Sequence, residues 1–390
     1  MLVTNGNGEP ETGDAAQTRT PFRAAPGASI RRVLMTTDAV GGVWQYSLDL
    51  ATAFHERGIE TTLAVMGPAM NAGQRDEALR RGIHFVEAPY QLEWAESPWD
   101  DVDRAGDWLL SLAATVRPDI VHLNGYCHAV LPWTSRPIVV AHSCVRSWWR
   151  AVHGAAAPAK WDRYTGAVME GLAAAHLVVA PSLAMISMLH EEYGAFGRWA
   201  VIPNGRATVG EMPDSIPLKS DVVFSAGRLW DKAKNIGALS SVADQLSWRV
   251  VIAGAGGADG LGAAAANVTR LGLIASSTMS RWYARAAIYV LPALYEPFGL
   301  SILEAAASGC ALVLGDIPSL RENWSDAAVF VNPRDRQELA FAIQSLIDNP
   351  VERRRLAMRG MARARLFTVS RMADAYLAAY QTVPSHAGVL

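Results

Sequence analysis

Two glutamates eight positions apart frame the stretch EPFGLSILE, residues 296–304. Within it begins an expected helix, Leu300 to Ser308, that is almost wholly apolar and is followed by Gly309. A helix that is apolar on all sides is typically buried. An unpaired buried carboxylate is costly, so Glu304 in the first turn of this helix needs a polar partner. That partner is either another residue of the chain or a ligand.

A nucleotide sugar is a ligand that would satisfy both carboxylates. Glu304 can accept two hydrogen bonds from a ribose diol, and the N–H groups of Phe298, Gly299 and Leu300 at the helix start suit a diphosphate. Glu296, one loop earlier, would then reach hydroxyls of the group attached to that diphosphate. The alternative is a structural Glu304 paired with Arg or Lys and an exposed Glu296. The residues alone leave both interpretations open.

Cationic side chains follow another expected strand, in the stretch SAGRLWDKAKN at 225–235. Arg228 suits a bidentate contact with phosphate, and Lys232 or Lys234 can add a point charge. Ligands of parallel sheets bind beyond the carboxyl ends of the strands, so this position favours a phosphate site. The same charges would also suit a solvated surface.

Two loops in the first half of the chain carry further candidates. Gly41 and Gly42 stand between a strand-like and a helix-like segment, where they either admit a phosphate close to the backbone or only permit a tight turn. His142 ends the strand-like run 137–143 and is either structural or part of a site. Trp148 either lies in a core or offers a face on which a sugar ring stacks.

Composition narrows the class of protein. The chain has 390 residues, enough for two domains, and 35 Lys and Arg against 37 Asp and Glu give a net charge of −2, so global charge does not point to nucleic acid. The three cysteines are scattered and lack metal-ligand spacing, which indicates a reducing compartment. Because no apolar run is suited to span a bilayer, the sequence predicts a soluble, cytoplasmic protein.

Strand-like and helix-like segments alternate along the whole chain, which predicts an α/β protein with two parallel, doubly wound sheets and a site in the cleft between them. The predicted divisions are a disordered arm at 1–29, a first domain at 30–205, a linker at 206–220, a second domain at 221–369 and a final helix within 370–390.

Together these stretches resemble glycosyltransferase family 4, whose members are retaining enzymes of the GT-B architecture. The resemblance extends from about Arg31 to Tyr380, and its most specific part is the family's pair of glutamates separated by seven residues, here Glu296 and Glu304. Three weaker stretches fit the same family in the same order: VVAPS (178–182), VIPNG (201–205) and SAGRL (225–229). The resemblance implies two Rossmann-like domains facing each other across a cleft, with the last helix returning to the first domain.

The resemblance also implies roles for the candidate residues. Arg228 and Lys234 would hold the donor diphosphate, Glu304 the ribose, and Glu296 the hydroxyls of the transferred sugar. His142 matches a histidine that contacts the donor sugar near its reacting end. The remaining residues form two groups: Gly41, Gly42, Phe298, Gly299 and Leu300 would complete the donor cradle, and Asn124, Tyr126 and Trp148 would lie on the acceptor side.

Two departures from the family pattern leave questions open. Ser143 follows His142 where many members have aspartate. The interval from Arg228 to Lys234 is one residue longer than the commonest form, so Lys232 remains an alternative for the diphosphate.

The activity implied by the resemblance is retaining transfer of a sugar from a nucleotide-diphosphate sugar to a carbohydrate, lipid-linked or small-molecule acceptor. No Asp-x-Asp pair stands at an expected strand end, so we expect no metal ion and no cofactor besides the donor substrate. The base and the sugar of the donor stay unassigned.

Three other classes of protein remain open. A nucleotide-sugar epimerase or a phosphorylase shares the architecture, and a non-catalytic carbohydrate-binding protein would retain the tryptophans. An NAD-dependent oxidoreductase is disfavoured because the glycines at 253–260 do not have the dinucleotide-binding spacing.

The basic segment 352–365 suggests peripheral membrane contact, but its acidic neighbours favour a solvated helix.

Overall fold

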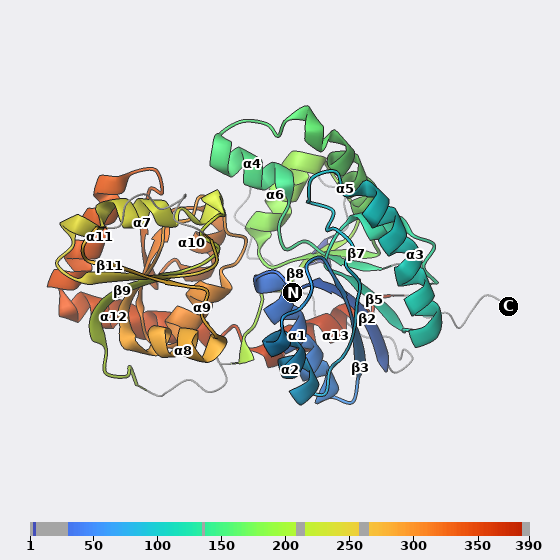
Figure 1. The fold of residues 1–390 in the computed structure, drawn as a ribbon, viewed down its shortest axis with the longest axis horizontal. Coiled ribbons are helices and arrows are strands. Elements are labelled where there is room, and N and C mark those ends of the chain that lie inside the picture. The colour runs from blue at the N-terminus through green and yellow to red at the C-terminus, as the bar shows by residue number, and fades with distance from the viewer. Residues whose placement is uncertain (1–2, 5–29, 135–136, 208–214, 257–264, 384–390) are drawn as a thin grey trace. The chain divides into compact units, whose positions relative to one another are not determined.

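The computed structural model describes residues 3–4, 30–134, 137–207, 215–256 and 265–383. The chain divides into two compact units, each built around its own sheet (Figure 1). The first unit comprises Met1–Arg146, Ala157–Pro203 and Ser370–Leu390, and the second comprises Ser147–Ala156 and Asn204–Val369.

The sheet of the first unit has the order β1-β8-β7-β6-β5-β2-β3-β4. Neighbouring strands are parallel except β1, which runs antiparallel to β8. The strands are β1 (Val3–Thr4), β2 (Arg32–Asp38), β3 (Glu60–Met66), β4 (His84–Glu87), β5 (Ile120–Leu123), β6 (Ile138–Val140), β7 (Leu177–Ala180) and β8 (Trp199–Val201). The winding direction reverses between β2 and β5, and a doubly wound sheet binds ligands beyond the carboxyl ends of its strands at such a reversal.

The helices of the first unit connect and cover these strands. They are α1 (Gly42–His55), α2 (Ala72–Arg80), α3 (Trp99–Val116), α5 (Asp162–Ala174), α6 (Leu183–Tyr193) and α13 (Val369–Tyr380), with short 3-10 turns at Cys127–Val130 and Ala159–Trp161. Helix α4 (Val145–His153) crosses the boundary at which the chain passes from the first unit into the second.

The sheet of the second unit is parallel throughout, in the order β11-β10-β9-β12-β13-β14, and reverses between β9 and β12. Its strands are β9 (Ser220–Ala226), β10 (Arg249–Ala253), β11 (Val268–Gly272), β12 (Ala286–Leu291), β13 (Ala311–Gly315) and β14 (Ala328–Val331). Its helices are α7 (Ile236–Val242), α8 (Ser276–Arg285), α9 (Leu300–Ala307), α10 (Pro318–Trp324), α11 (Arg336–Asp348) and α12 (Pro350–Ala364), with short 3-10 turns at Lys232–Lys234 and Ala243–Gln245.

Burial on both faces explains why the strands of the second unit are apolar runs without alternation. Every residue of β12 and of β13 is buried. Helices α7 and α11 pack on one face of the sheet, and α8, α9 and α12 pack on the other (Figure 1). A parallel sheet covered in this way selects β-branched and aliphatic residues at successive positions.

The last helix packs on the first unit, which confirms that part of the expected architecture. On α13, Ser370 Oγ and Asp374 Oδ1 accept hydrogen bonds from Arg57 at 2.8 and 2.9 Å. At the other end of α13, the Tyr380 hydroxyl lies 2.6 Å from His122 Nδ1, although 258 positions separate the two residues in sequence.

The structure differs from the sequence-based divisions at three places. Val3–Thr4 form an edge strand beside β8, so disorder is wrong for these two residues, while the rest of the predicted arm lies outside the described residues. The segment Ser147–Ala156 belongs to the second unit. In the predicted linker, Arg206 belongs to the second unit and forms an isolated parallel β-bridge with Thr368. Residues 208–214 of the linker lie outside the described residues.

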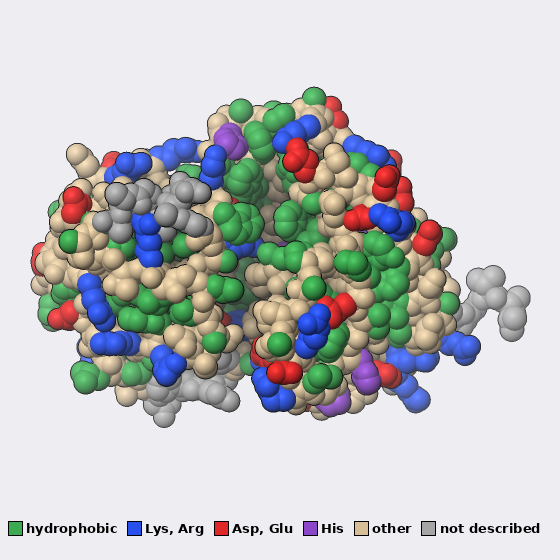
Figure 2. Space-filling view, viewed as in Figure 1, with side chains coloured by type: hydrophobic (Ala, Val, Ile, Leu, Met, Phe, Trp, Pro, Cys, Tyr) green, Lys and Arg blue, Asp and Glu red, His purple; other side chains and the backbone are tan. Residues whose placement is uncertain are grey.

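The surface shows no single-sign region on the face seen in Figure 2, where Lys and Arg side chains are scattered among apolar and uncharged ones. Among the described residues, no helix combines the length and the apolar character needed to cross a bilayer.

Candidate active site

The predicted phosphate-binding and sugar-binding residues of the second unit follow the two strands between which its sheet reverses. Arg228 comes just after β9, and Glu296 comes in the loop after β12. Since β9 and β12 pair in parallel, both loops emerge at the same edge of the sheet. This is the position at which doubly wound sheets bind ligands.

Lys234 and Glu296 form an ion pair across these two loops. The Lys234 Nζ lies 2.5 Å from Glu296 Oε2, and the two side chains are only 16% and 11% exposed. The Ser319 hydroxyl donates to the backbone carbonyl of Glu296 at 2.6 Å and fixes that loop. Lys232, in contrast, is exposed. The structure therefore brings Lys234, and not Lys232, to the glutamate.

Asp231 organises the cationic loop, and sequence reasoning did not identify it. Its Oδ1 accepts from the Ala233 N–H at 3.0 Å, and its Oδ2 accepts from Arg228 Nη2 at 2.8 Å. Burial raises the pKa of the Asp231 carboxyl, but Lys234 and Arg228 together outweigh that effect and hold the pKa below its usual range. The guanidinium of Arg228 also lies over the Trp230 ring, 5.2 Å from its centroid.

The start of α9 is shaped by Gly299. This residue has a φ of 91°, in the left-handed region, and a Cβ added there would lie 2.6 Å from Ile302 Cδ1. The Gly299 carbonyl accepts from the N–H groups of Ile302 and Leu303 at 3.0 Å each, so the helix begins directly after it. Phe298 is 2% exposed and packs edge-on against Phe367, which anchors the loop before the helix.

Glu304 has a protein partner, Arg206. Both Nε and Nη2 of Arg206 donate to Glu304 Oε1, at 2.8 and 2.5 Å. The arginine side chain is 9% exposed and that of Glu304 is 21% exposed. Burial raises the pKa of the Tyr283 hydroxyl, and the neighbouring Glu304 raises it further. Glu304 therefore has the arginine partner that a purely structural role would require. That partner, Arg206, lies in the segment that the sequence predicted as a linker.

In the first unit, His142 is held by Asn124. The distance from His142 Nε2 to Asn124 Oδ1 is 2.8 Å, and the edge of the Tyr46 ring packs against the imidazole at a centroid distance of 4.5 Å. His142 follows β6, and burial lowers its pKa to about 3. The imidazole is thus neutral at ordinary pH.

The other first-unit candidates have different surroundings. Gly41 has a φ of 73° and precedes α1, as a tight turn requires, and Gly42 is the first residue of that helix; both are exposed. Tyr126 is 2% exposed, and its hydroxyl donates to the Ser143 carbonyl at 2.9 Å. Asn124 uses both ends of its amide within the protein. Neither Asn124 nor Tyr126 therefore presents an obvious surface to an acceptor.

Trp148, also predicted on the acceptor side, lies on α4 in the part of that helix that belongs to the second unit. Its indole N–H donates to Asp231 Oδ1 at 2.9 Å. The ring centroids of Trp148 and Trp149 lie 6.0 Å apart, and those of Trp149 and His153 lie 4.5 Å apart.

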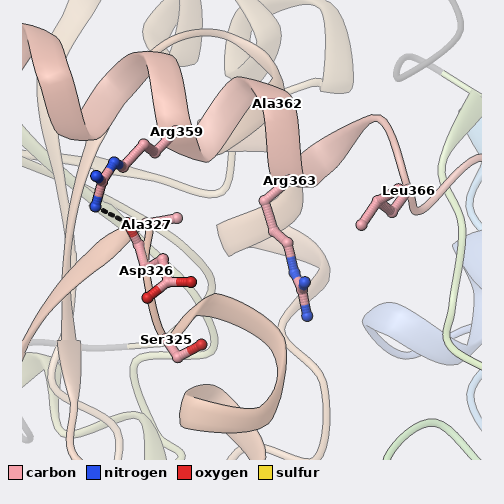
Figure 3. A pocket seen from close by; sticks show the side chains of 7 residues that line it. All are labelled: Ser325, Asp326, Ala327, Arg359, Ala362, Arg363 and Leu366. Atoms are coloured by element: carbon pink, nitrogen blue, oxygen red, sulfur yellow. Dashed lines mark hydrogen bonds between the residues drawn. The ribbon is translucent and has the colours of Figure 1, made fainter.

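Two arginines of the basic segment cap helix ends. Arg353 donates to the carbonyls of Leu346 and Ile347 at the end of α11, and Arg363 donates to that of Asn323 at the end of α10. A pocket beside α12 is lined by Ser325, Asp326, Ala327, Arg359, Ala362, Arg363 and Leu366 (Figure 3). None of these residues belongs to the candidate site, and the capping contacts favour a structural role for the segment.

Within the part of the chain that the structure describes, no three His, Cys, Asp or Glu side chains gather as a metal-binding group.

Two family models match consecutive parts of the chain. "Glycosyltransferase Family 4" matches residues 40–208, and "Glycosyl transferases group 1" matches residues 220–349. Among curated proteins, O-antigen chain mannosyltransferase B of Escherichia coli is 33% identical over 98 residues, which are 25% of this chain and 26% of that protein. The matched segments span between 18% and 28% of the length of the curated relatives.

Solved structures share the fold over nearly the whole chain. Sucrose-phosphate synthase of Thermosynechococcus elongatus superposes with a TM-score of 0.76 at 18% identity, covering 90% of this chain and 98% of that one. Anabaena HepE, solved in complex with UDP and glucose, superposes with a TM-score of 0.67 at 16% identity over 90% and 98% of the two chains. At these identities the likeness establishes the architecture alone.

Proposed function

The chain belongs to glycosyltransferase family 4, and we propose on that premise that it transfers a sugar from a nucleotide-diphosphate sugar to an acceptor, with retention and without a metal ion. The acceptor would be a carbohydrate, a lipid-linked sugar or a small molecule. The observation that carries the proposal is the ion pair of Lys234 and Glu296 at the point where the second sheet reverses.

The pair suggests how the donor would be recognised. A diphosphate carries more negative charge than a single carboxylate and would take over Lys234 together with Arg228. Glu296 would then be released from Lys234 to accept hydrogen bonds from hydroxyls of the transferred sugar. The glutamate thus keeps the lysine oriented in the free protein and contributes to sugar recognition when the donor is bound.

The chemistry would rest on charge stabilisation. Breaking the bond between sugar and diphosphate leaves additional negative charge on the departing nucleotide, which Arg228, Lys234 and the start of α9 would stabilise. The acceptor hydroxyl would attack the face from which the nucleotide departs, and its proton would pass to the departing phosphate. This path needs no basic side chain. We assign none.

Glu304 would bind the ribose while remaining paired with Arg206. Arg206 Nε and Nη2 both donate to Oε1, so the arginine would orient the carboxylate toward a ribose hydroxyl. The structural and ligand-binding interpretations of Glu304 are then compatible.

A thermal-shift screen with UDP-, GDP- and ADP-sugars tests the proposed donor class. A ligand that binds only the folded protein at one hundred times its Kd stabilises it by about 2.7 kcal/mol, so one base and sugar should stand out. If every nucleotide sugar leaves the melting temperature unchanged while a free oligosaccharide raises it, the protein is a carbohydrate-binding protein.

Metal independence has its own test. We expect release of nucleoside diphosphate from the cognate donor to proceed at the same rate in EDTA as in Mg²⁺, because Arg228 and Lys234 are proposed to supply the charge. Activity abolished by EDTA and restored by Mg²⁺ or Mn²⁺ would contradict this part of the proposal.

A further inference from the structure

Asn235 directly follows Lys234 and joins the 3-10 turn Lys232–Lys234 to helix α7. Its φ and ψ are 53° and 29°, in the left-handed region, where a side chain is strained and which asparagine tolerates better than most residues. Its N–H donates to the Lys232 carbonyl at 3.2 Å, and its carbonyl accepts from the Ala238 N–H at 3.0 Å. Asn235 is therefore the point at which the chain turns from the cationic loop into α7.

The side chain of Asn235 does not cap α7 but reaches two other loops. Its Nδ2 donates to the carbonyl of Pro292 at 2.9 Å and to that of Pro333 at 2.7 Å, so both hydrogens of the amide have an acceptor. Pro292 directly follows β12, and Pro333 stands two positions after β14. Asn235 thus ties the loop after β9 to the loops after β12 and β14.

A second contact joins the loops after β9 and β12 on the other side of Lys234. The Ala233 carbonyl accepts from the Leu294 N–H at 2.8 Å. Lys234 therefore stands between two residues that are each hydrogen-bonded to the loop leading from β12 to Glu296. These bonds fix the backbone of Lys234 relative to the glutamate with which its Nζ pairs.

The orientation of the 3-10 turn decides which lysine faces Glu296. Residues two positions apart in such a turn are rotated by about 240° around its axis, so Lys232 and Lys234 point to different sides. Lys232 is exposed, whereas Lys234 is turned toward the glutamate. Asn235 holds the carboxyl end of this turn.

We propose that Asn235 is a positioning residue whose hydrogen bonds to the two prolyl carbonyls hold Lys234 in place for the diphosphate of the donor. A lysine is a point charge on a flexible side chain, so the position of its backbone decides which phosphate oxygens its Nζ can reach. The role toward the diphosphate rests on the proposed function, whereas the hydrogen bonds belong to the free protein. All the residues involved lie in the second unit.

A double-mutant cycle tests whether Asn235 acts through Lys234. Asn235→Gly removes the amide and keeps a backbone that adopts left-handed φ without strain. Calorimetric titrations with UDP, GDP and ADP compare the wild type, Asn235→Gly, Lys234→Ala and the double variant.

For the nucleoside diphosphate that the wild type binds, we expect Asn235→Gly to weaken affinity about tenfold, within the range measured for residues of one hydrogen-bond network. In the Lys234→Ala background the same substitution should change affinity by less than about twofold. Equal losses in the two backgrounds would overturn the proposal, because Asn235 would then act independently of Lys234. Wild-type affinity in Asn235→Gly would overturn it as well.

Asn267→Gly is the matched control. The Nδ2 of Asn267 also donates to backbone carbonyls of the second unit, those of Ala243, Leu246 and Trp248. Asn267 directly precedes β11, so it lies at the amino ends of the parallel strands, whereas the candidate site lies at their carboxyl ends. Both glycine variants should unfold at lower urea concentration, but only Asn235→Gly should lose affinity. An equal loss of affinity in Asn267→Gly would show that general destabilisation weakens binding, and would refute positioning by Asn235.

NMR on the wild type, labelled with 15N-asparagine and with proline carrying 13C in its carbonyl group, tests the hydrogen bonds without a variant or a ligand. We expect one asparagine side-chain nitrogen to couple through hydrogen bonds to two prolyl carbonyls. Absence of this coupling would overturn the proposal even if Asn235→Gly does not fold. If the wild type binds no nucleoside diphosphate, the proposed function fails and the role of Asn235 toward the donor fails with it, while the coupling seen by NMR remains.

Discussion

At the scale of single residues, the cationic side chains of the candidate site already form ion pairs with carboxylates in the free protein. Glu304 is one of those carboxylates. Lys234 pairs with Glu296, Arg228 with Asp231, and Arg206 with Glu304. Long cationic side chains lose considerable rotamer entropy when a ligand orders them. Carboxylates that already orient these cationic side chains in the free protein reduce the entropy lost when the ligand binds. Charges oriented in advance also stabilise a transition state most effectively.

Glu304→Gln tests the Arg206 pair. We expect the unliganded protein to lose ~1–3 kcal/mol of unfolding free energy, because the buried guanidinium keeps an acceptor but loses its counter-charge. Donor binding should also weaken by ~1.5–3 kcal/mol if Glu304 binds the ribose. Urea denaturation and calorimetric Kd values on the same variant give both numbers.

The matched control is Asp316→Asn, which breaks the ion pair with Arg321 on the surface of the same unit. Both side chains of that pair are well exposed, at 39% and 52%, so stability should change by less than ~1 kcal/mol. A Glu304→Gln variant that loses stability but keeps the wild-type donor Kd would restrict Glu304 to a structural role.

At the scale of elements, the position of α9 depends on the loop that delivers it. Gly299→Ala places a methyl group 2.6 Å from Ile302 Cδ1 at a φ of 91°, where a side chain is strained. We expect a loss of ~1–3 kcal/mol of unfolding free energy in urea denaturation. Gly197→Ala is the control, since nothing lies within 4 Å of a Cβ at that site. Equal stability of the two variants would show that the loop readily relaxes.

Elements with strong apolar runs were predictable from sequence, and contacts between distant segments were not. The helix expected at Leu300–Ser308 is α9, Leu300–Ala307, because its apolar residues and the following glycine mark it locally. Arg206 was missed because its segment is rich in Pro and Gly and shows no periodicity. The hydrogen bond between Tyr380 and His122 was missed because it spans 258 positions, which no local pattern records.

At the scale of the whole molecule, the buried histidines make stability depend on pH. The pKa of His122 and that of His142 are both lowered to about 3, from the ordinary value of 6.5. Between those values the unfolded chain binds protons that the folded protein does not, so stability falls as pH is lowered. The slope should approach about 1.4 kcal/mol per pH unit for each histidine.

Urea denaturation between about pH 7 and 5 measures this slope, with the unfolded-state histidine titrating near 6.5. His122→Gln should flatten the dependence by about half. His55→Gln, at an exposed position on α1, should leave it as in the wild type. A wild-type stability that does not change over this range would mean that the two imidazoles are not held neutral.

The proposed sugar transfer requires a nucleotide-sugar site around Lys234 in the second unit. Isothermal titration calorimetry with the cognate nucleotide sugar on the wild type, Lys234→Ala and Lys232→Ala tests it most directly. We expect saturable binding by the wild type and by Lys232→Ala, whose lysine is exposed, and affinity reduced roughly 10²-fold or more in Lys234→Ala. Wild-type affinity in Lys234→Ala, together with lost affinity in Lys232→Ala, would contradict the proposed site.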